Sequence, residues 1–223
     1  MGTKLRLFLV LIGGLLVAAT FTYPSWRPAP IGEVEAAEFP GLPAELQDDF
    51  QALPERIRRD YLLMRQVDEQ QALALLRARL VVPASLSPEE QALPPVESAS
   101  IIRESVFASP QLEEEDDREL PQFVDLYSAA GTVRIYQFPD ERKLLRIENL
   151  QVVNGPELWV ALTTHSAPLT FDEIQGYQEL GPLRATSGNM NFEIPAERDL
   201  NYYHSIVIFD RPYRIIFAVA RIG

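Results

Sequence analysis

The sequence predicts a mainly β protein in which a β domain follows a membrane segment and a short helical segment. Three observations support this fold class. From Gln122 onward, short runs rich in β-branched and aromatic residues alternate with turn residues, at the spacing of a sandwich or barrel. Between Phe39 and Val82, apolar residues recur every three or four positions. Near the N-terminus, an uninterrupted apolar run begins at Leu7.

These observations divide the chain into four predicted parts. We expect a membrane segment at 1–26, a helical stalk at 27–82, a linker at 83–121 and a β-sandwich domain at 122–223.

The domain at 122–223 is predicted to be an antiparallel β-sandwich. In its last run, every second residue from Tyr213 to Val219 is apolar, so one face of that strand is strongly apolar. Turn sequences such as the Asn-Gly-Pro at 154–156 separate the runs, because glycine permits positive φ and proline fixes φ. The predicted strands are 123–127, 131–138, 143–152, 158–162, 177–180, 191–194, 205–209 and 213–222.

The apolar periodicity before the domain predicts two helices, at 43–52 and 54–81. Pro54 suits the first turn of the second helix, where its missing N–H is not needed. We interpret this region as a helical hairpin or stalk, packed on itself or on the membrane surface. A helix that mediates oligomerisation or binds a partner is the alternative.

Residues 83–121 are predicted to be a linker. Six prolines interrupt this stretch, and an acidic run at 113–117 lies near its end. Calcium loops place oxygen ligands at alternating positions around a glycine turn, and this pattern is absent from the acidic run. The composition therefore indicates a solvated, self-repelling spacer.

The N-terminal segment indicates membrane targeting. Lys4 and Arg6 precede an apolar run from Leu7 to Thr22, whose length lies between a signal-peptide core and a spanning helix. Both a cleaved signal peptide and a retained anchor at residues 5–26 fit, and we expect the anchor because aromatic residues follow the run. The positive-inside rule then predicts a single-pass protein of the cell membrane with its C-terminal domain outside the cytoplasm.

Charge and composition exclude several classes of function. The formal net charge is −12 and the pI is near 4.7, so the surface would repel a nucleic acid. The chain contains no cysteine, which excludes disulfides, thiolate metal sites, iron–sulfur clusters and cysteine nucleophiles.

An ordered set of short motifs in the β domain resembles the DM-thirteen family. The set begins at Gly131, passes through Leu158, Leu180 and Tyr203, and closes with the run 213–220. The motif positions that carry the resemblance are Asn154, Gly155, Pro156, Gly181, Pro182, Gly188, Asn189, Pro195, Phe209, Asp210 and Phe217.

This resemblance implies an extracytoplasmic β-sandwich, immunoglobulin-like or DOMON-like, and the family is proposed to transfer electrons through a cysteine. The family's cysteine follows an aromatic residue in the penultimate strand, and the matching positions here are Phe209 and Asp210. A carboxylate cannot form a sulfenate, a disulfide or a thiolate ligand, which weakens a redox role. An aspartate before Arg211 and Pro212 is also an ordinary residue to open a turn.

The other residues with useful chemistry do not form a recognisable catalytic or metal-binding pattern. His165 has Asp172 and Glu173 nearby, but the spacing is not that of a metal site, and Ser166 is only a sequence neighbour of that histidine. We therefore expect no enzyme, no catalytic residues, no metal and no cofactor. Trp159 is predicted to lie in the core, and one residue of the pair Tyr202 and Tyr203 to be exposed.

The leading hypothesis is a membrane-anchored, non-enzymatic binding module of the cell envelope, with an envelope protein or a surface polymer as its partner. One alternative is an electron-transfer accessory protein that binds a haem or similar cofactor through His165, His204 or Met190. A further alternative is a structural role, in which the helical segment mediates assembly and the sandwich packs against it.

Overall fold

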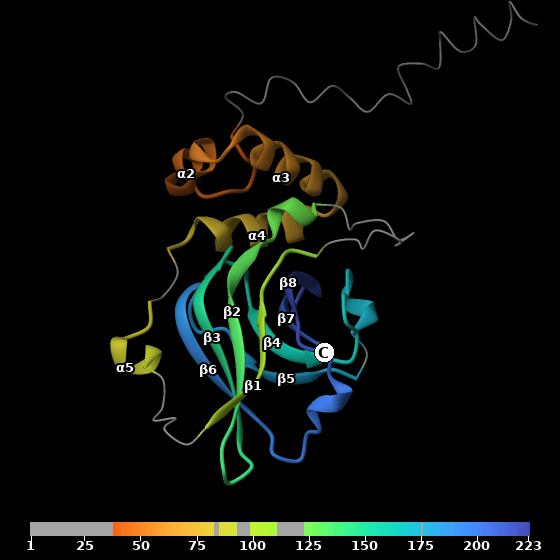
Figure 1. Ribbon diagram of the computed structural model, residues 1–223. Helices are drawn as coiled ribbons and strands as arrows, with labels where there is room; N and C mark the ends of the chain where they lie inside the picture. The colour runs from red at the N-terminus through yellow and green to blue at the C-terminus, as the bar shows by residue number, and fades with distance from the viewer. Residues whose placement is uncertain (1–37, 83–84, 93–98, 111–122, 175) are drawn as a thin grey trace, which may run out of the picture. The chain divides into compact units, whose positions relative to one another are not determined.

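The computed structural model describes residues 38–82, 85–92, 99–110, 123–174 and 176–223 (Figure 1). Within these residues, two antiparallel sheets of four strands each have the orders β1-β2-β3-β6 and β5-β4-β7-β8. The arrangement is that of a β-sandwich, so the predicted mainly β, antiparallel fold is confirmed. The strands are β1 (Ser100–Val106), β2 (Ala129–Gln137), β3 (Lys143–Val152), β4 (Leu158–Thr163), β5 (Gln178–Pro182), β6 (Ser187–Ile194), β7 (Ser205–Asp210) and β8 (Ile215–Arg221).

The facing sides of the two sheets share one hydrophobic core. Ile135 and Leu145 of the first sheet and Val160 and Ile208 of the second are all buried in it. Alternation along each strand places these residues on the inner faces. The burial of their side chains stabilises the packing of the sheets.

The region predicted as the first strand, 123–127, is instead a short 3-10 helix, η3 (Val124–Leu126). Phe123 before it has a φ of 63°, in the left-handed region, and its carbonyl accepts the N–H of Leu126 at 2.8 Å. This conformation turns the chain, so the apolar residues there do not continue as a strand.

Part of the region predicted as a linker has regular structure. Strand β1 pairs antiparallel with β2 at the edge of the first sheet, with a register shift between Ile101 and Arg103. A short helix, α5 (Pro88–Gln91), begins with a capping box formed by Ser87 and Glu90. The acidic run at 113–117 lies outside the described residues.

The helical region contains α2 (Gln47–Ala52), α3 (Glu55–Val67) and α4 (Glu69–Leu80). The predicted helix at 54–81 is therefore interrupted at Asp68. Asp68 has an extended backbone, and its side chain accepts the N–H of Gln71 at the start of α4. Pro54 directly precedes α3 as its N-cap residue.

These helices pack against the β-sandwich. Phe50 and Leu75 are buried in the same hydrophobic cluster as the inner faces of the sheets. The Arg79 guanidinium donates to the carbonyl of Leu126 at 3.2 Å. Residues Glu38–Gly223 form one compact unit. The apolar stripe predicted from the sequence therefore packs against the sandwich of the same chain. We call α2, α3 and α4 the helical layer (Figure 1).

The predicted membrane segment at residues 5–26 lies outside the described residues. In the part of the chain that the structure describes, no helix is both long and apolar enough to cross a membrane.

Candidate functional site

Asp210 ends β7 on the inner face of the second sheet. The register of β4 and β7 pairs Asp210 with Leu158 and Phe209 with Trp159. Since successive side chains of a strand point to opposite faces, Asp210 and Trp159 lie on opposite sides of this sheet. They therefore do not share one surface.

The Asp210 carboxylate is completely buried and joins two turns. Its Oδ2 accepts the backbone N–H of Glu157 at 3.0 Å, and its Oδ1 accepts that of Tyr213 at 3.1 Å. The N–H of Arg211 donates to the carbonyl of Glu157 at 3.0 Å. The prediction that Asp210 opens a turn is confirmed, and the same side chain also fixes the turn before β4.

Burial raises the pKa of the Asp210 carboxyl, although the N–H groups of Glu157 and Tyr213 favour its charged form and oppose this shift. Burial also raises the pKa of the Tyr127 hydroxyl, and the neighbouring Tyr61 and Asp210 add to that shift. The Asp210 carboxyl and the Tyr127 hydroxyl are therefore two titratable groups whose charged forms burial disfavours.

Gly155 lies directly against Asp210, and the space there excludes a side chain. A Cβ at this position would lie 2.7 Å from Leu158 Cδ2, 3.1 Å from Phe217 Cζ and 3.2 Å from Asp210 Oδ2. Phe217 is the extra residue at a register shift in the pairing of β7 with β8. Gly155 thus lies next to two other motif positions, Phe217 and Asp210.

Asn154 links this turn to the helical layer, because its Nδ2 donates to the carbonyl of Ala78 in α4 at 2.8 Å. Between the end of α4 and the turn lies an open groove of about 340 Å³. We call it the motif groove; it is lined by Val81, Val82, residues 154–158 and residues 182–186.

The lip of the motif groove exposes apolar side chains. Val81 is 52% exposed and Val82 is 89% exposed. Glu157 and Arg184 add one charge of each sign to the lining. The arrangement can accommodate an apolar group of a partner beside backbone and charged groups.

The structure gathers only some of the predicted motif positions here. The lining includes Asn154, Gly155, Pro156 and Pro182; Asp210 and Phe217 lie next to Gly155, and Gly181 precedes Pro182. Gly188 and Asn189 instead contact Gln91, the last residue of α5, while Phe209 lies on the outer face of the second sheet. Pro195 lines a different pocket.

Val81 and Val82 belong to none of the sequence motifs. The available signal was an apolar pair that follows the last turn of a predicted helix and precedes Pro83. A pair outside the helical stripe does not pack with the apolar face of that helix, so it is available for other contacts.

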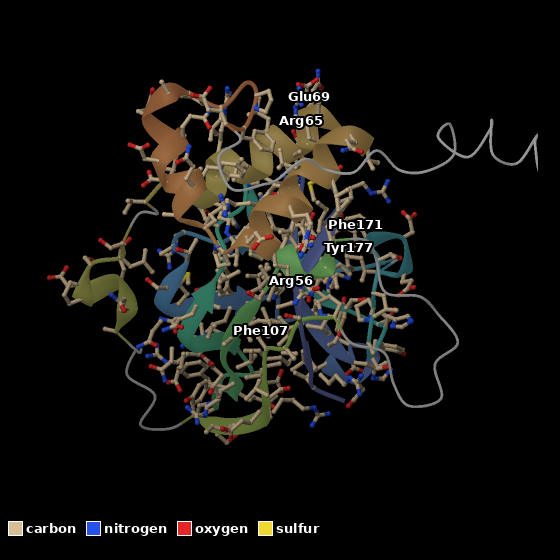
Figure 2. The ribbon with its side chains drawn as sticks, turned by 90° about the horizontal axis from the view of Figure 1, so that it is seen from above. Arg56, Arg65, Glu69, Phe107, Phe171 and Tyr177 are labelled. Carbon is tan, nitrogen blue, oxygen red and sulfur yellow. The ribbon has the colours of Figure 1, made fainter. Side chains whose placement is uncertain are left out.

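Trp159 is only partly buried, so its prediction as a core residue is wrong in detail. It packs on the outer face of the second sheet, in a separate apolar cluster that includes Phe209, Phe171 and Tyr177. Phe171 and Tyr177 lie side by side (Figure 2), and their ring centroids are 5.4 Å apart. The Arg211 guanidinium lies 4.3 Å from the centroid of the Trp159 ring. Phe171 and Ile174, which lie between β4 and β5, help to cover this face.

The candidate haem ligands are separated and engaged elsewhere. Met190 is fully buried in the main core, and Nδ1 of His165 accepts the N–H of Ala167 at 3.2 Å. His204 contacts the C-terminal Gly223. Within the described residues, no group of three or more histidine, cysteine or carboxylate side chains is placed to hold a metal ion.

Tyr202 is 70% exposed and Tyr203 is buried, so the prediction that one of the two is exposed is confirmed. The reason differs from the predicted alternation along a strand, because Tyr202 belongs to a 3-10 helix, η5 (Leu200–Tyr202).

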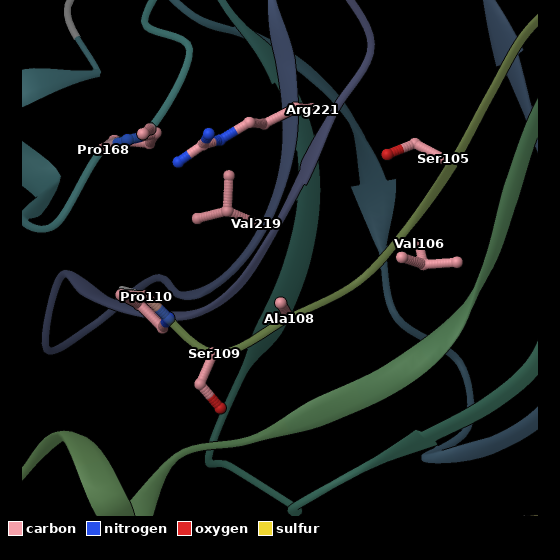
Figure 3. A pocket seen from close by; sticks show the side chains of 9 residues that line it. Ser105, Val106, Ala108, Ser109, Pro110, Pro168, Val219 and Arg221 are labelled. Atoms are coloured by element: carbon pink, nitrogen blue, oxygen red, sulfur yellow. The ribbon is translucent and has the colours of Figure 1, made fainter. Parts of the chain in front are cut away.

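A second cavity lies where the chain after β1 reaches β8. Ala108 forms a bridge with Val219, and the cavity beside it has a volume of about 300 Å³. Figure 3 shows the Arg221 side chain extending between Pro168 and Val219. None of the motif positions lines this cavity, so it is not our candidate site.

Comparison with known proteins supports the resemblance read from the motifs. Residues 122–222 match the family model described as electron transfer DM13. No curated protein and no solved structure matches the chain.

Proposed function

Because residues 122–222 form a domain of the electron transfer DM13 family, we propose that this domain is a non-enzymatic binding module of the cell envelope that recognises its partner through the motif groove. The observation that carries the proposal is the convergence of separate family motifs on one groove. Asn154, Gly155 and Pro156 meet Pro182 there, with Asp210 buried next to Gly155.

The surface of the groove favours a protein partner over a sugar polymer. Val81 and Val82 expose apolar side chains at its lip, and removing this apolar surface from water is favourable. A partner segment that inserts an apolar side chain would bury this surface, while Glu157 and Arg184 supply polar contacts at the rim.

The groove is also pre-organised. Asp210 fixes the turn at Glu157, Asn154 ties that turn to α4, and no rearrangement is needed to open the groove. Pre-organisation lowers the entropy cost of binding.

Site-specific photo-crosslinking in the native host tests this proposal. A photoreactive residue replaces Arg184 at the groove, and a second version of the full chain carries it at the exposed Tyr202 as a control. We expect a discrete crosslinked protein from position 184 that is absent from position 202. Identical products at the two positions, or none at position 184, would contradict the proposal.

We further propose that residues 5–26 anchor the protein in the cell membrane with the β domain outside the cytoplasm. The support is the order of the sequence: Lys4 and Arg6 precede the apolar run. Protease added to intact cells stripped of their outer barrier should digest the β domain. A β domain that is degraded only after the membrane is lysed would count against this topology.

Electron transfer is the second candidate function, and the description of the family favours it. Asp210 stands at the family's cysteine position, so any redox role of this chain needs another group. Visible absorption after haem addition to the full chain tests the cofactor version. A spectrum identical to that of free haem would exclude it.

A further inference from the structure

A separate pocket lies at the other end of the sandwich, where β3 begins and β6 ends. Its volume is about 570 Å³, within the range of small-molecule sites. β3 runs from Lys143, which lines this pocket, to Val152, close to the motif groove, so roughly 30 Å of extended strand separates the two. Figure 1 shows the β2–β3 turn at the end of the sheets away from the helical layer. We call this second site the end pocket.

Apolar side chains form the body of the end pocket. Leu144 is a buried residue of β3, and Phe138 lies in the β2–β3 turn. Together they provide a surface for an aliphatic or aromatic group.

Two cations line the same pocket. Lys143 donates through Nζ to the carbonyls of Ala196 and Arg198, both at 3.1 Å. An ammonium has three N–H donors, so one remains for a ligand. Lys143 forms no ion pair with any of the residues that the structure describes, and its charge is therefore not neutralised by a carboxylate.

Arg142 is the second cation. Its guanidinium pairs with the exposed Asp140 at 2.7 Å and lies 4.9 Å from the centroid of the Phe138 ring. Its side chain is 66% exposed, so it can turn toward a ligand at little cost. Glu193 is the single carboxylate in the lining, and Asp140 pairs with Arg142, so Lys143 is the cation of this site that has no ion-pair partner among the described residues.

We infer that the end pocket binds a small amphipathic anion, with its apolar body against Leu144 and Phe138 and its acidic head at Lys143 and Arg142. A carboxylate, sulfonate or phosphate head would satisfy this chemistry, because each offers oxygen acceptors for charged N–H donors. Nothing in this inference depends on the motif groove, so either site can fail without the other.

Titration of the full chain with three probes that share an eight-carbon body tests the inference. Octanoate is the anion, 1-octanol the neutral control and octylammonium the cationic control, and saturation-transfer NMR with calorimetry measures binding. We expect octanoate to bind about tenfold more tightly than octanol, the size of effect that a charged hydrogen bond gives, and octylammonium to bind most weakly.

Variants locate the site. Lys143→Gln and Arg142→Gln should each weaken octanoate binding about tenfold and leave octanol binding unchanged. Glu193→Gln should tighten octanoate binding, and Ala196→Trp should fill the pocket and abolish binding of both probes. Arg184→Gln, at the motif groove, is the matched control and should have no effect.

If Lys143→Gln loosens the turn at 196–198, the Arg142→Gln variant still tests the inference, because the carboxylate with which Arg142 forms its ion pair is exposed. The inference is overturned if octanol binds as tightly as octanoate. It is also overturned if octanoate does not bind, or if Arg142→Gln and Ala196→Trp leave octanoate binding unchanged.

Discussion

Asp210 accepts the backbone N–H of Glu157 at 3.0 Å, and this contact joins the end of β7 to the turn that leads into β4. The same carboxylate holds the N–H of Tyr213 in the β7–β8 turn. Asp210 is therefore a buried structural link beside the motif groove.

Replacement of Asp210 by alanine should lower the free energy of unfolding by about 2–4 kcal/mol, because it leaves two buried N–H groups without an acceptor. Urea denaturation measures this change. Asp172→Ala is the control, since that carboxylate is 85% exposed and pairs with Arg214 on the surface. If the two variants lose similar amounts of unfolding free energy, the buried hydrogen bonds of Asp210 do not stabilise the fold as we predict.

The pH dependence of stability should reveal the raised pKa of Asp210. A folded-state pKa above the unfolded value means that the folded protein binds more protons, so this contribution to stability is greatest in acid. It is lost as the pH rises through the folded-state pKa. The unfolding free energy of the wild type minus that of Asp210→Asn should therefore fall as pH increases from the unfolded pKa. A difference that grows with pH would contradict this account.

Gly155→Ala should destabilise the protein by about 1–3 kcal/mol, the usual cost of overpacking a core. The added Cβ would lie 2.7 Å from Leu158 Cδ2. In a Leu158→Ala background this contact is absent, so the penalty of Gly155→Ala should be smaller. Thermal or urea unfolding of the four proteins in this cycle measures the coupling, and strictly additive effects would refute the proposed clash.

Asn154→Ala should loosen the attachment of α4 to the sandwich, because it removes the bond to the carbonyl of Ala78. We expect a loss of about 1 kcal/mol and faster amide exchange in α4. Asn201→Ala, at an exposed position in η5, should change neither quantity. Unchanged exchange in α4 of the Asn154 variant would mean that other contacts hold the helix.

Turn chemistry and runs of β-forming residues predicted most strands of the β domain, although β7 is buried along its whole length and not on one face alone. β1 was not predicted, since its edge position leaves most of it exposed and charged residues such as Arg103 and Glu104 interrupt its apolar pattern. The prediction of a strand at 123–127 was wrong for the opposite reason. Its residues favour a strand, but the left-handed backbone at Phe123 turns the chain.

The helical periodicity correctly indicated helices but not what they pack against. Phe50 and Leu75 would show the same spacing in an isolated stalk, whereas here they are buried with the core of the sandwich. For the same reason the sequence did not reveal the motif groove. Val81 and Val82 are distant in sequence from Gly155, and only the packing of the helical layer places them at one surface.

Our central claim is that the motif groove binds a protein partner, and two matched substitutions test it most directly. Val82→Asp changes a side chain that is 89% exposed at the groove, while Val67→Asp changes one that is 73% exposed at the end of α3. Neither should alter stability by more than about 0.5 kcal/mol. The measurement is the yield of the crosslinked partner from position 184 in each background. We predict that Val82→Asp abolishes the crosslink and Val67→Asp preserves it; equal yields in the two variants would contradict the claim.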